Sequence, residues 1–210
     1  MTRSGGLHLF NDAVTRQAPG NAMGVRIINS TISGNQSSTT AGAMVVFGNI
    51  ALELYNSTVS DNVALPNRTG GIAMSVGVTS PPSASDTARP TLRLVSSILA
   101  NSIGVDVSAG TALFGPFTID AANSVVENIC PAPNCAISVN GTGNLIGVDP
   151  LLGLLTDNGG PSRTHAPLPG SPVINAGSNP FGLTTDQRGD GFPRTVGAGT
   201  DMGAFESASP

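Results

Sequence analysis

Short segments in which apolar and polar residues alternate recur along the first two thirds of the chain. The segments are 25–27 (VRI), 52–54 (LEL), 92–94 (LRL), 117–119 (FTI) and 137–139 (ISV). Alternation with a period of two indicates a β-strand with one buried face. No intervening segment has the periodicity or length of an amphipathic helix, so the pattern predicts an all-β protein.

A polar motif follows these segments at a regular interval. Residues 29–35 read NSTISGN, and residues 56–62, which begin 27 positions later, read NSTVSDN. Weaker copies at 96–101 (SSILAN) and 123–128 (NSVVEN) end 27 positions apart. The second and third copies end 39 positions apart, and we assign the excess to an inserted loop, rich in Pro, Ser and Thr, at 77–90.

The repeat predicts the fold class. A unit of about 20 to 30 residues with two or three short strands and no helix is typical of a parallel β-helix, a solenoid whose coils stack on one another. The usual handedness of parallel crossovers makes it right-handed. Residues 1–148 would form the coils, and residues 149–210 would form an irregular closing segment.

Stacked coils would place equivalent residues directly over one another. The repeat predicts an inward apolar ladder of Ile32, Val59, Ile98 and Val125. It also predicts an asparagine ladder at a turn, because an Asn side chain both donates and accepts hydrogen bonds. The members of that ladder would be Asn35, Asn62, Asn101 and Asn128. On the outer face, Arg26, Glu53 and Arg93 would alternate in charge.

Composition argues against a nucleic-acid-binding protein and against a membrane-spanning helix. Only 10% of the residues are charged, the net charge is −4 and every basic residue is Arg, so the chain offers no basic surface to a nucleic acid. No apolar run approaches the roughly 18 residues of a membrane-spanning helix, and the N-terminus lacks the pattern of an export signal. We expect any signal and anchor to lie outside this sequence.

The C-terminal third resembles a known family. An ordered series of short motifs is similar to the closing segment of the choice-of-anchor Q domain, found in bacterial surface proteins that carry right-handed β-helix repeats. The motifs are 149–152 (DPLL), 157–160 (DNGG), 164–165 (TH), 170–177 (GSPVINAG), 186–189 (DQRG) and 201–206 (DMGAFE). The resemblance implies a β-helix at the bacterial cell surface, and it brings no established catalytic residues.

Cys130 and Cys135 are the only cysteines and enclose four residues. An even pair without further thiols indicates a disulfide, since a zinc site would need two more ligands and a redox pair favours two intervening residues. A disulfide implies an oxidising compartment, and hence an extracellular or cell-surface location.

Two further candidate sites have weaker patterns. Asp186 and Asp190 lie in the segment DQRGDG, which has the oxygen ligands and glycine turns of a Ca²⁺ loop but not its alternating acids, so a Ca²⁺ site is weighed against a solvated turn. His165 could serve as a general base, but no nucleophile motif accompanies it, which favours a structural role.

The distribution of side chains bears on function. The acids of the repeats are dispersed, without the paired carboxylates of a glycoside hydrolase. Aromatic residues make up 4% of the chain, with no Trp and one Tyr, so surfaces that stack on sugars should be nearly absent. No catalytic residue and no cofactor is assigned.

These observations favour a non-catalytic extracellular β-helix domain of a bacterial surface or secreted protein. It would act as an adhesive or structural stalk, with an extracellular glycan or a host or cell-surface protein as partner. The alternative is a carbohydrate-active β-helix enzyme, a polysaccharide lyase or glycoside hydrolase, or a glycan-binding module.

Overall fold

The structure is a computed structural model that describes residues 5–11, 22–75, 89–110, 116–131 and 135–208. These residues form sixteen strands and no helix. The chain is therefore all-β, as predicted. No helix in the described part of the chain is long and apolar enough to cross a membrane.

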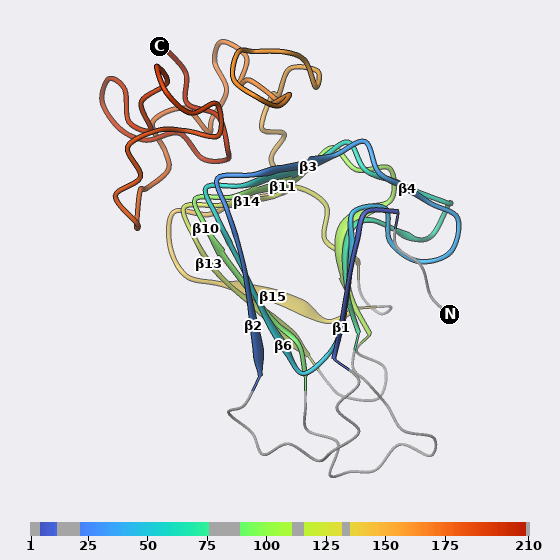
Figure 1. The fold of residues 1–210 in the computed structure, drawn as a ribbon. Helices are drawn as coiled ribbons and strands as arrows, with labels where there is room; N and C mark the ends of the chain where they lie inside the picture. The colour runs from blue at the N-terminus through green and yellow to red at the C-terminus, as the bar shows by residue number, and fades with distance from the viewer. Residues whose placement is uncertain (1–4, 12–21, 76–88, 111–115, 132–134, 209–210) are drawn as a thin grey trace, which may run out of the picture.

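Fourteen of the sixteen strands form three parallel sheets, each built from strands that are separated in the sequence (Figure 1). Sheet A contains β1 (Leu7–Asn11), β5 (Met44–Gly48), β9 (Thr69–Ser75) and β12 (Val105–Ala109). Sheet B contains β2 (Met23–Ile28), β6 (Ile50–Tyr55), β10 (Thr91–Val95), β13 (Phe117–Ala122) and β15 (Ile137–Asn140). Sheet C contains β3 (Thr31–Ser33), β7 (Thr58–Ser60), β11 (Ile98–Ala100), β14 (Val125–Val126) and β16 (Leu145–Ile146). A two-stranded sheet of β4 (Gln36–Ser37) and β8 (Val63–Ala64) projects beyond sheet C.

Successive passes of the chain visit the sheets in the same order, and each strand pairs in parallel with its equivalent from the next pass. This arrangement of stacked parallel sheets is consistent with a β-solenoid. Seen along the stack, the sheets surround the core like the sides of a triangle (Figure 1).

All five alternating segments lie in sheet B, which confirms them as strands. Leu52 pairs with Val25 on one side and with Leu92 on the other, so their apolar side chains share the buried face. The charged residues share the outer face. Arg26 Nε lies 2.6 Å from Glu53 Oε2, and Arg93 Nε lies 3.7 Å from Asp120 Oδ2. Asp120 therefore extends the predicted alternation of charge by one strand.

The predicted apolar ladder in sheet C is wrong at its third coil. Val59 pairs with Ile32, as expected, but its partner on the other side is Leu99 rather than Ile98. The repeat therefore lengthens from 27 to 40 residues at this step, as the Ser57–Ser97 hydrogen bond also indicates. Because side chains alternate between faces, a slip of one residue turns Ile98 and Val125 away from the main core. Of the inserted loop assigned to 77–90, residues 77–88 lie outside the described residues.

The asparagine ladder is also only partly formed. Asn35 Nδ2 donates to Asn62 Oδ1 at 3.0 Å, which confirms the first step. The same slip places Asn101 beside Asp61, so it does not continue the stack. Its backbone N–H donates instead to Glu127 Oε2, and that of Asn128 donates to Asp106 Oδ2.

A second polar ladder occupies the corner between sheets B and C. The Oγ atoms of Ser57, Ser97 and Ser124 each accept a hydrogen bond from the backbone N–H of the equivalent residue in the preceding coil. The residue before each corner serine has a positive φ. These residues are Asn29, Asn56, Ser96 and Asn123. Asn tolerates this left-handed conformation better than most residues, which explains the recurring Asn-Ser pair.

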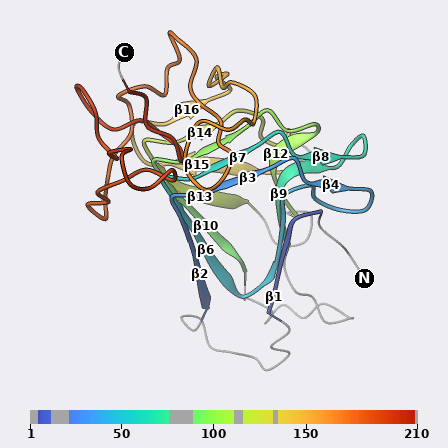
Figure 2. The same ribbon diagram turned by 45° about the horizontal axis from the view of Figure 1, so that its top comes forward.

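Residues 149–208 contain only isolated antiparallel bridges and lie over the outer face of sheet C (Figures 1 and 2). Val173 and Met202 pack there against Ile98 and Val125 in a second apolar cluster. The approach is close at Gly203, whose φ is +91° and where a Cβ would lie 2.8 Å from Ile98 Cδ1. The closing segment thus covers the apolar side chains that the slip turned outward.

Candidate binding groove

A groove lies on the outer face of sheet A. It has a volume of about 670 Å³, within the range typical of ligand sites. Alternation along β5 explains its apolar lining, because Met44 and Val46 point into the core while Val45 and Phe47 line the groove. Ala73 of β9 continues this lining on the neighbouring strand.

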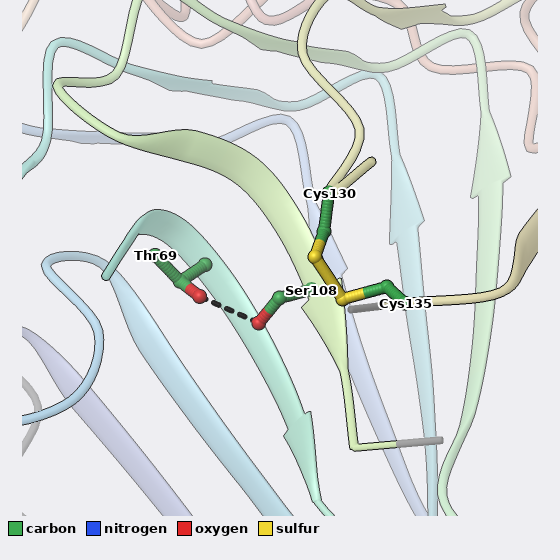
Figure 3. The surroundings of a disulfide bond; sticks show 4 residues. All are labelled: Thr69, Ser108, Cys130 and Cys135. Atoms are coloured by element: carbon green, nitrogen blue, oxygen red, sulfur yellow. Dashed lines mark hydrogen bonds between the residues drawn. A yellow bond between two sulfur atoms is a disulfide. The ribbon is translucent and has the colours of Figure 1, made fainter. Parts of the chain in front are cut away.

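Polar residues line the other part of the groove. Thr69 Oγ1 and Ser108 Oγ are 2.5 Å apart and join β9 to β12 (Figure 3). Asn67 and Arg68 come from the turn between β8 and β9, where Asn67 has a φ of +64° and the Arg68 N–H donates to Leu65 O. Arg68 is exposed and is the one charged residue among the described residues that line the groove.

An aromatic surface adjoins the groove. The rings of Phe10 and Phe47 stack with their centroids 4.9 Å apart and their planes 14° from parallel. His8 meets Phe10 edge-on, and Phe10 remains 49% exposed. This pair is an aromatic surface that the low aromatic content of the sequence did not predict. The parallel pairing of β1 with β5 brings these two phenylalanines together, although they are 37 residues apart in the sequence.

The predicted disulfide is confirmed. Cys130 and Cys135 are bonded, and Cys130 lines the groove beside β12 (Figure 3). The Cys130 N–H donates to Val107 O, so the bridge is attached to sheet A. A disulfide of this kind fits an oxidising compartment.

His165 is buried between the closing segment and the edge of sheet C. Its Nδ1 lies 2.7 Å from Gly153 O, and its Nε2 lies 2.8 Å from Ser33 Oγ. Because a carbonyl only accepts, Nδ1–H donates to Gly153 O, while Nε2 shares a hydrogen bond with the serine hydroxyl. In a hydrolase triad the serine and the acid bond opposite ring nitrogens of the histidine. Here Asp61 Oδ2 is 4.0 Å from Nε2, the same nitrogen that Ser33 contacts, so the three groups do not form a triad. The contacts support the structural role that the sequence favours.

Asp186 is buried inside the closing segment, where it forms an ion pair with Arg188. Arg188 Nη2 lies 2.6 Å from Asp186 Oδ2, and the backbone N–H of Glu206 donates to the same oxygen. The Arg188 guanidinium lies between the rings of Phe192 and Phe205, 4.0 and 3.7 Å from their centroids. This geometry favours a structural interpretation of the DQRGDG segment over a Ca²⁺ loop.

Asp190, the other residue proposed for Ca²⁺, is exposed. The described residues contain no group of three or more His, Cys, Asp or Glu side chains placed to hold a metal ion.

A second buried ion pair completes the closing segment. Arg194 is fully buried, and its guanidinium donates to Gly203 O, Asp201 O and Glu206 Oε2. Burial lowers the pKa of Arg194 and raises the pKa of Glu206 to about 7, although the backbone N–H groups of Asp201 and Val196 oppose the second shift. Because these groups bond one another and the backbone, they serve to order the segment.

Asp106 is the buried acid of the coils. Its two carboxylate oxygens accept from the backbone N–H groups of Ser102 and Asn128. Burial raises its pKa to about 6, and the charge of Glu127 adds to the shift. Asp106 thereby ties the end of sheet C to the start of sheet A.

The groove residues could have been anticipated only in part. His8 with Phe10, and Val45 with Phe47, alternate as they would on one strand face. No pattern in the sequence joins Arg68 or Cys130 to them. The chain matches no protein-family model, no curated protein and no solved structure, so its family is not assigned by comparison.

Proposed function

We propose that this chain is a right-handed parallel β-helix domain of an exported bacterial surface protein, and that it binds extracellular glycans through the outer face of sheet A. The observation that carries the proposal is the groove beside stacked Phe10 and Phe47. A pyranose ring has an apolar C–H face and a polar hydroxyl edge. The groove offers aromatic and aliphatic surface next to Thr69, Ser108 and Asn67, which can bond hydroxyl groups.

The scaffold supports an adhesive role rather than a catalytic one. Parallel strands paired residue by residue hold Phe47 and Ala73 at defined positions. Among the described residues that line the groove there is no Asp, Glu or His, the groups on which glycoside hydrolysis and general base catalysis depend. A binding module therefore fits the groove better than a hydrolase or lyase.

The proposed location at the cell surface has two supports. The disulfide fits an oxidising compartment. The ordered motifs of residues 149–206 resemble the choice-of-anchor Q closing segment, and we propose that the chain is related to that group.

The test is a glycan array probed with the full chain and two variants. We expect Phe47→Ala to remove or strongly weaken the binding seen with the wild type. Phe181→Ala is the control, because Phe181 is an exposed phenylalanine of the closing segment that packs on Tyr55 of β6 and does not line the groove. Circular dichroism would establish that both variants remain folded. Absence of wild-type binding, or equal loss in both folded variants, would contradict the proposal, as would cleavage of a bound polysaccharide.

A further inference from the structure

We infer that the groove selects acidic glycans, with Arg68 pairing with a sugar carboxylate while a neighbouring ring packs on Phe47. This inference rests on the proposed glycan-binding function and specifies its ligand class. Three features of the groove support it: an unpaired cation, a defined backbone turn that carries this cation and an apolar surface beside it.

The first feature is the state of Arg68. Four other arginines of the described residues are held in ion pairs. These are Arg26, Arg93, Arg188 and Arg194. Arg68 forms no ion pair within the described part of the chain, and no acid is found among the described groove residues. The whole chain carries a net charge of −4, whereas the described residues that line the groove carry a net positive charge, from Arg68.

The second feature is the turn that carries Arg68. The positive φ of Asn67 and the hydrogen bond from the Arg68 N–H to Leu65 O define the path of this turn. On the other side, Gly104 has a φ of +107°, and a Cβ there would lie 2.3 Å from Arg68 O. The backbone at Arg68 is thus held closely against β12. The turn therefore fixes the point from which the exposed Arg68 side chain extends, and its planar guanidinium suits bidentate pairing with a carboxylate.

The third feature is the apolar surface in the same groove. The half-buried Phe47 and Ala73 present carbon to a ligand, and Ser108, whose hydroxyl bonds that of the buried Thr69, presents a hydroxyl group. An acidic peptide or a simple anion would use the charge of Arg68 but not the aromatic surface. A carboxylated oligosaccharide uses the cation, the hydroxyl groups and the ring together, which is why we assign this class.

The experiment compares two oligosaccharides with the same sugar backbone, one with free carboxylates and one with each carboxylate converted to an uncharged methyl ester. The probes are a galacturonic acid hexamer and its methyl-esterified form, titrated calorimetrically into the full chain. We expect the acid form to bind at least about tenfold more tightly, and this preference to weaken as salt is raised. Arg68→Gln should reduce the affinity for the acid to that for the ester. Arg93→Gln, which removes an exposed arginine on sheet B, is the matched control and should change neither.

The outcomes separate this inference from the function on which it rests. If both probes bind equally to the wild type and Phe47→Ala weakens both, acid selection is wrong while glycan binding stands. If neither probe nor any arrayed glycan binds, the proposed function fails. An aspartate-rich peptide of equal charge that competes as well as the acid hexamer would also overturn the inference. Such a peptide has no sugar ring to pack on Phe47, so equal competition would mean that charge alone determines binding.

Discussion

The buried polar residues of this protein act at chain corners, where few apolar side chains are available. Asp106 bonds two backbone N–H groups from different segments, and Ser57 and Ser97 link consecutive coils through their hydroxyl groups. Each such contact satisfies a donor that would otherwise be buried without a partner, which costs about 1 to 3 kcal/mol. Burial of the carboxylate has a further consequence, since it raises the pKa of Asp106.

Asp106→Asn should change how stability depends on pH. A carboxyl whose pKa is raised to about 6 on folding keeps its proton in the native state while the unfolded chain loses it. The contribution of Asp106 is therefore fully present below its unfolded value of 3.8 and is lost as the pH rises through about 6. Relative to wild type, the variant should gain up to about 3 kcal/mol between pH 4 and pH 7.

Chemical denaturation at several pH values in this range measures that difference. Replacing an oxygen by an amide NH₂ also removes one acceptor from the backbone N–H groups. That penalty is the same at every pH. The informative quantity is therefore the slope of the free energy of unfolding against pH, and not the constant difference in stability between the two proteins. Parallel curves for the two proteins would show that Asp106 has no raised pKa.

Glu53→Arg should lower the melting temperature slightly. Glu53 pairs with Arg26 and lies in register with Arg93, so the substitution would place three arginines side by side on sheet B. Solvent screens exposed charges, so the effect should be small and should shrink in high salt. Glu53→Gln is the control that removes the pair without adding repulsion. A variant as stable as the control at low salt would contradict the proposed charge stack.

The corner residues also connect one element to another. Asn29, Asn56 and Asn123 donate from Nδ2 to backbone carbonyls of the closing segment at Thr185, Ser178 and Ala176. The residue before the corner serine thus bonds the closing segment in three of the coils. Sheet C and the closing segment therefore form one packed unit, although the closing segment has no strands of its own beyond isolated bridges.

Asn56 tests this attachment. It is fully buried, has a φ of +44° and bonds Ser178 O at 2.8 Å. Asn56→Ala loses the bond and also strains the backbone, for an expected cost of about 2 kcal/mol, whereas Asn56→Gly loses only the bond, at about 1 kcal/mol. Urea denaturation of both variants measures the difference. An alanine variant at least as stable as the glycine variant would show that backbone strain is not part of the cost.

At the scale of the molecule, the core is continuous along the stack and thins toward its ends. Leu52, Leu54, Leu92 and Leu94 are buried to 1% exposure or less. In β2 and β15, by contrast, no residue reaches full burial. Each strand contacts chiefly its neighbours, so local stability should follow the number of paired neighbours and the depth of burial.

Hydrogen exchange should therefore report a gradient along sheet B. Backbone amides of β6 and β10, which have a paired strand on both sides, should exchange most slowly. Amides of β2 and β15, which have a paired strand on one side within the described residues, should exchange faster. Mass spectrometry of peptides from each strand gives the comparison. Uniform protection along the sheet would indicate a single cooperative unit instead.

Much of the fold could be predicted because strand patterns are local. Alternation in segments such as 52–54 shows which side chains of one strand share a face, and the NST motif marks the corner in the first two coils. The step from Val59 to Leu99 could not be predicted, because segment 63–95 sets the register and contains no copy of the motif. One residue of slip reverses the face of every side chain that follows in the strand.

The sequence by itself determined the strands of sheet B, their inward residues and the pairing of Cys130 with Cys135, since each depends on periodicity or on a short separation. Only the tertiary structure decided that Ile98 and Val125 face the closing segment. It alone brought Phe10 beside Phe47 and placed Arg68 in the same groove. These contacts join residues far apart in the chain, and they exist only once hydrogen bonds between coils have set the register of one strand against the next.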